Sequence, residues 1–325
     1  MGRKHLIGLA LLVAVLAAPY AWLQRDEKPA RVEREALFPG FASPSAGVRA
    51  IEVHRPGEPA VRVEREDGQR WRVPAKAGYP ARTQAVVELL EALAGARKVQ
   101  ATNASPALPG LAEDGDPANQ ATRLDLEREG GAPLALLVGR PARQEEGQWV
   151  RVPGESQAWL IDRDIELPPT ELAWLDRRVA ALPLADIQRL EVRHATGEHL
   201  ALSREHSGDA GFGVAPLPVG RHLARVDVAN GLPAVFADLD FADAAPRQQA
   251  TFKAPPVLTF SLRTFAGGQA TGSVYAQGDQ HWLVLDSRTD LTDGQWPGRS
   301  DWAYRLDDDR YQALATPLDR LLAKP

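Results

Sequence analysis

The order of secondary-structure signals in this 325-residue sequence occurs twice, at a spacing of about 140 residues. In each copy, three short runs of alternating apolar and polar residues come first, which is typical of half-buried strands. A helical pattern, four more strand patterns and a short closing helix follow. This period is too long for a solenoid repeat and indicates a duplicated domain, although two unrelated meanders of alternating strands would produce a similar pattern.

The first copy extends over residues 48–183 and begins with a hairpin signal, Asp67-Gly68, between its second and third strands. Apolar residues at helical spacing predict a helix from Thr83, its early cap, to Gly95, and a short helix is expected over 168–181. The predicted strands are 48–54, 60–65, 69–73, 122–127, 134–138, 149–152 and 158–161.

The second, diverged copy extends over residues 184–325. Its helix is expected at 227–238, where Gly231 and Pro233 weaken it, and a closing helix is expected at 309–322. Its predicted strands are 187–193, 200–205, 211–214, 257–262, 269–275, 281–285 and 302–306. The sequence therefore predicts an α+β protein with two related modules, each an antiparallel β-sheet with a packed helix.

The N-terminus carries an uncharged apolar run, Leu6–Leu23, directly after the basic tripeptide Arg3-Lys4-His5. Its length is near the lower limit for crossing a bilayer as a helix, and the basic flank places the N-terminus in the cytoplasm. We expect a signal anchor over residues 1–25 and a polar, Pro-rich linker over 26–47. A cleaved signal peptide is the competing interpretation, and both interpretations imply export.

Composition excludes several classes of function. The net charge of −5 gives no support for nucleic-acid binding, and the absence of cysteine removes disulfides, thiolate nucleophiles and Cys-based metal sites. No cofactor is indicated.

Three constellations of polar residues were considered as sites, and none has the required pattern. His194 and His199 flank a turn and are interpreted as exposed hairpin residues rather than metal ligands. The spacing of Asp286, Asp290 and Asp293 differs from that of a calcium loop. The run 307–309 is expected to cap and charge the start of the last helix. No catalytic, cofactor-binding or metal-binding residue is assigned.

Most tryptophans lie on strand or helix patterns, which predicts that they are core residues. Trp296, in Gln295-Trp296-Pro297-Gly298, lies instead in a predicted loop. Exposed aromatic residues are enriched at contact surfaces, so Trp296 is a candidate partner contact.

Two groups of residues give the sequence a resemblance to a known family. They are the strand 48–53 with Asp67–Trp71 and the helix after Arg82, and then Gly147–Arg151 leading to Leu172–Arg177. Together they resemble the domain of unknown function 4340 family, well over Val48–Pro183 and more weakly over Leu184–Ala323. One departure is Leu108–Leu111, where many relatives carry an aromatic residue before Gly-Leu.

The resemblance implies an exported bacterial protein tethered to the inner membrane, often associated with an ABC-type transporter of the gliding-motility kind. It supplies no reaction and no catalytic residues. We therefore expect a periplasm-facing, non-enzymatic accessory protein held at the inner membrane through Leu6–Leu23, with ABC transporter subunits or other envelope proteins as partners. The alternatives are an envelope hydrolase whose acid and base carboxylates are distant in sequence, and a structural spacer.

Overall fold

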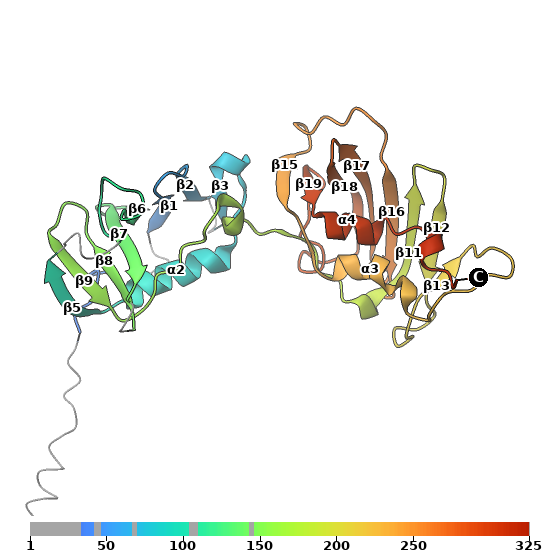
Figure 1. Ribbon diagram of the computed structural model, residues 1–325, viewed down its shortest axis with the longest axis horizontal. Coiled ribbons are helices and arrows are strands. Elements are labelled where there is room, and N and C mark those ends of the chain that lie inside the picture. Colours follow the sequence, from blue (N-terminus) through green and yellow to red (C-terminus); the bar gives the residue numbers. More distant parts are fainter. Residues whose placement is uncertain (1–33, 42–46, 67–69, 104–109, 143–145, 325) are drawn as a thin grey trace, which may run out of the picture.

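The computed structural model describes residues 34–41, 47–66, 70–103, 110–142 and 146–324, and these form two lobes arranged along the longest axis (Figure 1). Each lobe is built around one large antiparallel sheet, and there are few helices. The expected α+β class is confirmed at this level. Within the part of the chain that is described, no helix has the length and apolar character needed to cross a membrane. The predicted anchor and the Asp67-Gly68 turn lie outside the described residues.

The sheet of the first lobe has nine strands in the order β4-β3-β2-β1-β6-β7-β8-β9-β5. Alternation sets its two faces: in β2, Val61 and Val63 are buried while Arg62 and Glu64 lie on the outer face. The strands are β1 (Val48–His54), β2 (Val61–Arg65), β3 (Trp71–Val73), β4 (Tyr79–Pro80), β5 (Lys98–Asn103), β6 (Thr122–Arg128), β7 (Leu134–Pro141), β8 (Gln148–Arg151) and β9 (Gln157–Ile161).

The sheet of the second lobe has eight strands in the order β13-β12-β11-β16-β17-β18-β19-β15. Apart from the additional edge strand β4, this is the order of the first sheet, strand for strand. The strands are β11 (Ile187–His194), β12 (His199–Ser203), β13 (Gly213–Ala215), β15 (Asp243–Pro246), β16 (Leu258–Thr264), β17 (Gln269–Gln277), β18 (Gln280–Thr289) and β19 (Trp302–Leu306).

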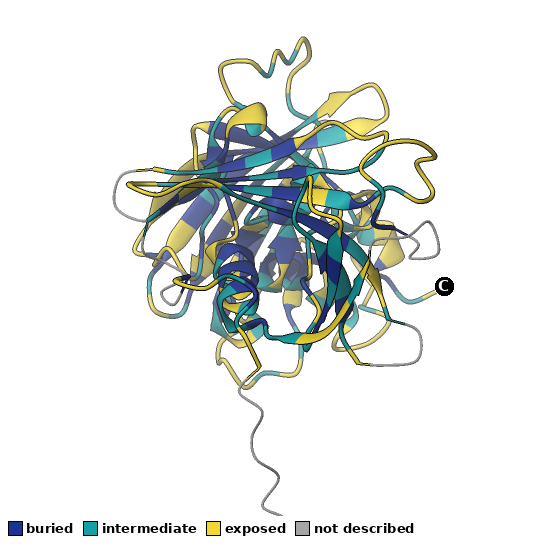
Figure 2. Cartoon of the chain, turned by 90° about the vertical axis from the view of Figure 1, so that its left-hand side faces the viewer, coloured by how far each residue is buried: buried dark blue, intermediate teal, exposed yellow. Residues whose placement is uncertain are grey.

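The helix of the first lobe, α2 (Thr83–Gly95), lies between β4 and β5 in the chain and begins where the sequence predicts. Arg82 is its N-cap, so Thr83 is the first helical residue rather than the cap. Its apolar stripe, with Val86, Leu89 and Leu93 buried, belongs to the main hydrophobic core. Figure 2 shows these buried parts of the helix and sheet enclosed by exposed loops.

The single helix expected at 227–238 in the second lobe is instead divided into short pieces around Gly231 and Pro233, the two residues expected to weaken it. They are η4 (Val228–Asn230), α3 (Gly231–Ala234) and η5 (Val235–Ala237). The predicted closing helix is also shorter, with α4 (Asp308–Leu314) followed by η6 (Leu318–Arg320). The remaining 3₁₀ turns are η1 (Pro74–Lys76), η2 (Glu171–Trp174) and η3 (Leu184–Asp186).

The ordered part of the first lobe begins earlier than predicted. Within the expected linker, Leu37 and Phe41 are buried in the main core, and the Leu37 N–H donates to the Ala96 carbonyl over 2.9 Å. The Lys98 N–H donates to the Glu35 carbonyl, so residues 35–37 lie beside the start of β5. The polar, proline-rich composition of this segment predicts a linker, so the burial of Leu37 and Phe41 could not be predicted from the sequence.

The segment that joins the lobes forms structure of its own. Its strand β10 (Arg178–Ala180) pairs with β14 (Leu239–Asp240) of the second lobe. At its N-terminal end, the Asp176 N–H donates to the Pro80 carbonyl of β4. The connection is therefore hydrogen-bonded to both lobes, and the predicted helix at 168–181 is wrong over most of its length.

One aromatic side chain of the first lobe enters the core of the second. Tyr79, on β4, is 3% exposed and packs edge-on against Trp302 and Phe241, with centroid distances of 4.7 and 5.2 Å. Its ring also meets that of Tyr304, whose hydroxyl accepts a hydrogen bond from the Arg299 N–H over 2.8 Å. Buried residues of both lobes consequently belong to one hydrophobic cluster.

Burial of this tyrosine pair predicts a loss of stability at alkaline pH. Burial raises the pKa of Tyr304 to about 12 and also raises the pKa of Tyr79 above the ordinary value. Because the folded state favours the neutral phenols, their stabilisation is complete below pH 10 and is lost as the pH rises toward 12. Urea unfolding between pH 9 and 12 tests this. The double variant Tyr79→Phe/Tyr304→Phe should lose less stability over that range, and an equal loss would contradict the assignment.

Candidate functional site

The junction carries an open groove of about 640 Å³ that combines the connecting segment with the second sheet. Asp176 and Arg178 contribute from the connection, and the end of β18 and the following loop form the rest. The lining residues are Asp176, Arg178, Leu285, Asp286, Ser287, Arg288, Asp293, Trp296, Pro297, Gly298, Arg299, Ser300 and Asp301.

Arginine–aspartate pairs dominate the groove. Arg178 binds Asp176 through two hydrogen bonds of 3.0 and 3.1 Å, and Arg299 binds Asp301 through two of 2.9 and 2.7 Å. Arg288 donates to Asp293 over 2.9 Å. Exposed pairs of this kind contribute little to stability, so a ligand can replace one partner at small cost.

The paired carboxylates further stabilise the charged form of these arginines. Hydrogen bonding to Asp176 raises the pKa of Arg178, and hydrogen bonding to Asp301 raises the pKa of Arg299. Both side chains are more than half exposed, so their guanidinium groups remain available to a ligand. The groove thus presents fixed donors and acceptors side by side.

Trp296 lines this groove in a different way from that expected. Its side chain is completely buried and stacks on Phe236 at 5.7 Å, because the loop folds back into the core. The expectation of an exposed Trp296 is therefore wrong, and the argument for a direct partner contact by this ring loses its basis. Its carbonyl instead accepts a hydrogen bond from Arg288, which helps to fix that side chain in the groove.

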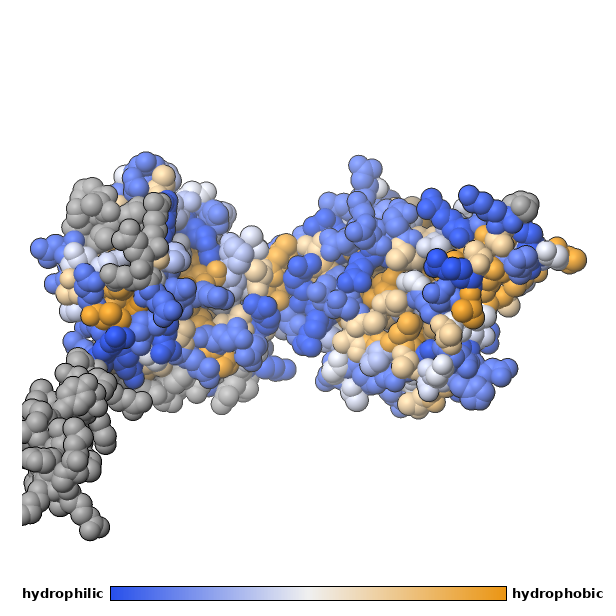
Figure 3. All heavy atoms as spheres, turned by 60° about the horizontal axis from the view of Figure 1, so that its bottom comes forward, coloured by the Kyte–Doolittle hydropathy of each residue, from blue (hydrophilic) through white to orange (hydrophobic). Residues whose placement is uncertain are grey.

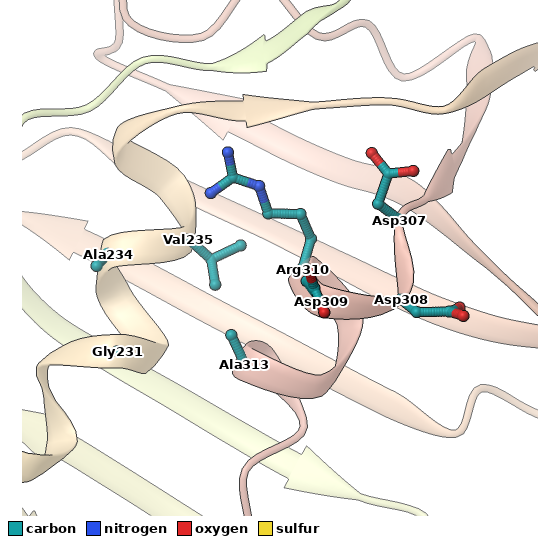
Figure 4. Close-up of a pocket in the computed structure, with 8 residues that line it drawn as sticks. All are labelled: Gly231, Ala234, Val235, Asp307, Asp308, Asp309, Arg310 and Ala313. Atoms are coloured by element: carbon teal, nitrogen blue, oxygen red, sulfur yellow. The ribbon is translucent and has the colours of Figure 1, made fainter.

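A second cavity, of about 680 Å³, lies between α3 and the start of α4. Asp307 precedes the helix as its N-cap without a side-chain capping bond, while Asp308 and Asp309 charge the first turn, as expected. Figure 4 shows that the side chains of Asp307 and Asp308 diverge rather than converge. Arg310, also in this cavity, pairs with Asp238 over 3.4 Å.

The two histidines of the β11–β12 hairpin lie on opposite faces of the sheet. In the hairpin, His199 is paired with Arg193, so these two side chains lie on the same face of the sheet. His194 follows Arg193 in the strand, and its side chain therefore points to the opposite face. His199 contacts Glu191 at 3.3 Å, and His194 lies 3.6 Å from Glu198.

The loop aspartates are also separated. Asp286 lies on β18 and accepts a hydrogen bond from Ser273, while Asp293 pairs with Arg288. Across the described ranges, no group of three or more acidic or histidine side chains is arranged to hold a metal.

The arginines of the groove were not singled out from the sequence, although a usable signal exists. In Asp176-Arg177-Arg178 and Arg299-Ser300-Asp301 the opposite charges are two residues apart, and in an extended segment such residues share one face. The same spacing joins Arg123 to Asp125 on the outer face of the first sheet. Only the fold shows which pairs gather at a cavity.

The fold and the groove together define a class: a two-lobed protein of antiparallel sheets with a charged groove at the lobe junction. A family model described as a domain of unknown function (DUF4340) matches residues 71–255, which is more than half of the chain. The chain belongs to this family, which confirms the resemblance seen in its sequence. The match begins at β3 and ends after β15, so it includes Tyr79 and the connecting segment but not the groove residues 285–301. No curated protein and no solved structure matches the chain.

Proposed function

We propose that this protein is a non-enzymatic accessory protein of the bacterial cell envelope, held at the inner membrane by Leu6–Leu23, that binds a partner protein through the junction groove. The observation that carries the proposal is the set of exposed Arg–Asp pairs lining one cavity. Each pair offers both a donor and an acceptor, which suits a polypeptide segment of mixed charge. The transporter association implied by the family resemblance makes an ABC transporter subunit the first partner to test.

The shared strand order of the two sheets supports a duplicated module as the building unit. The Gly298 N–H donates to the Val179 carbonyl and the Ala181 N–H donates to the Gln295 carbonyl, so the connecting segment and the loop after β18 keep a fixed spacing across the groove. A preorganised groove avoids the entropic cost of ordering its walls when a partner binds.

A hydrolase would need a carboxylate free to act as acid or base. In the groove, Asp176, Asp293 and Asp301 each bind an arginine, and Asp286 is held by Ser273 and Arg247. This pairing favours binding over acid–base chemistry at this site.

Reversing two groove charges should abolish partner binding without unfolding the protein. We expect the double variant Arg178→Glu/Arg299→Glu, purified full-length from native membranes, to lose at least about 90% of its specific partner, as charge reversal at a binding surface places like charges opposite each other. Quantitative mass spectrometry of the co-purified proteins measures this. Arg189→Glu is the matched control, because Arg189 is a similarly exposed arginine that pairs with Glu191 on β11, away from the groove. An unchanged partner set in the double variant, or turnover of an envelope substrate by the purified protein, would refute the proposal.

A further inference from the structure

Exposed apolar side chains are concentrated in a single loop at the far end of the second lobe. Of the four large hydrophobic residues exposed in the described chain, three lie between β13 and η4: Leu217, Val219 and Val226. Val219 is fully exposed, at 105% of its reference area. Apolar atoms are visible at this end of the molecule in Figure 3. Such clustering marks a contact surface, whereas single exposed aliphatic residues are ordinary.

This loop is held in a defined position by the C-terminal segment. The Ala224 N–H donates to the Leu321 carbonyl, and the Ala323 N–H donates to the His222 carbonyl, both over 2.9 Å. The Arg221 side chain donates to the Ala323 carbonyl. Val219 therefore protrudes from a loop whose following residues, 221–224, are held in place by hydrogen bonds to the C-terminal segment.

The base of the loop is basic. Arg221 and Arg225 belong to it, and Arg320 and Lys324 follow in the C-terminal segment that fastens it. Of these four cations, only Arg225 forms an ion pair within 4 Å with a described carboxylate, that of Asp227. The surface thus combines an apolar tip with unneutralised positive charge.

The first lobe contains a groove of the opposite character. A cavity of about 410 Å³ lies between α2 and residues 164–173, with an apolar floor that includes Leu89, Ala92 and Leu167. Arg55 fixes its wall by donating to the carbonyls of Leu167 and Pro168, at 3.1 and 2.7 Å.

Three carboxylates, those of Glu88, Asp164 and Glu166, line this groove, and all three residues are exposed. Among the described residues, none of them has an arginine or lysine within 4 Å, and Arg82 is the one cation in the lining. Elsewhere on the surface, carboxylates are commonly paired, as at Arg62 with Glu52, Glu64 and Glu127. The groove is therefore apolar inside and acidic at its rim.

We propose that the loop at residues 216–226 of one molecule docks into the α2 groove of a second copy, so that the chains associate head to tail. The apolar tip matches the apolar floor, and the basic side chains beside the loop match the rim carboxylates, which have no arginine or lysine within 4 Å among the described residues. Figure 1 shows α2 in one lobe and the C-terminal end, where the loop is fastened, at the far end of the other. A molecule's own loop cannot reach its own groove, so the occupant is another molecule. Such a heterologous contact leaves a free loop and a free groove at the two ends of every open assembly, which allows growth beyond a dimer, either into a filament or into a closed ring.

Disulfide trapping tests this contact cleanly, because the chain has no cysteine of its own. Full-length Val219→Cys and Ala92→Cys proteins with different tags are mixed in detergent and mildly oxidised. We expect the mixed disulfide to form at least about tenfold more readily than between Val219→Cys and Asp279→Cys, which places the second thiol on the exposed β17–β18 turn outside the groove. Equal yields for the two mixtures, or a dominant Val219–Val219 disulfide, would overturn the proposal.

Charge reversal supplies an independent test by sedimentation velocity. The loop variant Arg221→Glu/Arg225→Glu and the groove variant Glu88→Lys/Glu166→Lys should each associate at least about tenfold more weakly than the natural chain. A mixture of the two variants should assemble again, because each reversed surface then meets its complement. Failure of the mixture to assemble, while both variants keep the natural thermal transition, would contradict head-to-tail docking. So would loop-dependent binding to phosphatidylglycerol vesicles by a chain that stays monomeric.

Discussion

Tyr79→Ala is expected to lower the free energy of unfolding by about 3–5 kcal/mol, the cost of truncating a fully buried aromatic side chain. Tyr79 lies on an edge strand of the first sheet, yet its ring contacts are with Phe241, Trp302 and Tyr304 of the second lobe. The cavity would therefore open at the junction. We expect calorimetry to show one unfolding transition for the natural chain and two for the variant.

Two control variants separate the contributions of this side chain. Tyr79→Phe keeps the ring and removes the hydroxyl, so it should cost only about 1 kcal/mol and preserve a single transition. Tyr275→Ala removes a half-buried ring that stacks on Phe252 within the second lobe, and should not separate the lobes. A single transition in Tyr79→Ala would show that other contacts are sufficient to couple the two sheets.

Gly298→Ala is expected to destabilise the protein by about 2–3 kcal/mol, because overpacking a closed core site forces backbone movement. A methyl group at this position would lie 2.8 Å from the Val179 carbonyl oxygen and 2.7 Å from a Leu285 methyl group. The Gly298 N–H also donates to that carbonyl, so the loop cannot move away without losing a hydrogen bond to β10.

Gly294→Ala is the matched control in the same loop. Its added methyl group would meet nothing closer than the Thr292 hydroxyl at 3.9 Å. Chemical denaturation of the two variants should therefore differ by about 2 kcal/mol or more. Because Gly298 also lines the junction groove, the prediction further implies that partner binding is weakened by Gly298→Ala.

Local patterns were sufficient to predict most of the strands. Alternation located β1, β6 and β16, and helical spacing located α2, because each of these elements buries one regular face in a core. The edge strands β5 and β15 were missed. In β5, Val99 is exposed and no residue is buried. The strand pairs with β9 but buries neither face, so its sequence has no alternating hydrophobic pattern from which a strand could be predicted.

The sites were less predictable than the strands because they depend on contacts across long separations in the chain. Trp296 lies in a sequence typical of an exposed loop, but Phe236 and Phe260 provide an aromatic pocket that only the folded chain assembles. In the groove, residues 176–178 lie beside residues 285–301 because β10 pairs with β14 of the second lobe. The short strand β10 could not be predicted from the sequence, because polar residues precede it.

The shared strand order has a consequence for how the chain acquires its structure. In each sheet the edge strand that follows the helix, β5 or β15, pairs with the last strand of its lobe, β9 or β19. As the chain is synthesised or exported from its N-terminus, β5 contacts residues 35–36 at its start but has no strand partner until residues 157–161 emerge, and β15 has none until residues 302–306 emerge. Closing such long loops before any contact forms slows folding and exposes strand edges. Each lobe is therefore completed in a single late step at its C-terminal strand, and a chain halted before residue 302 would carry one finished sheet and one unpaired strand.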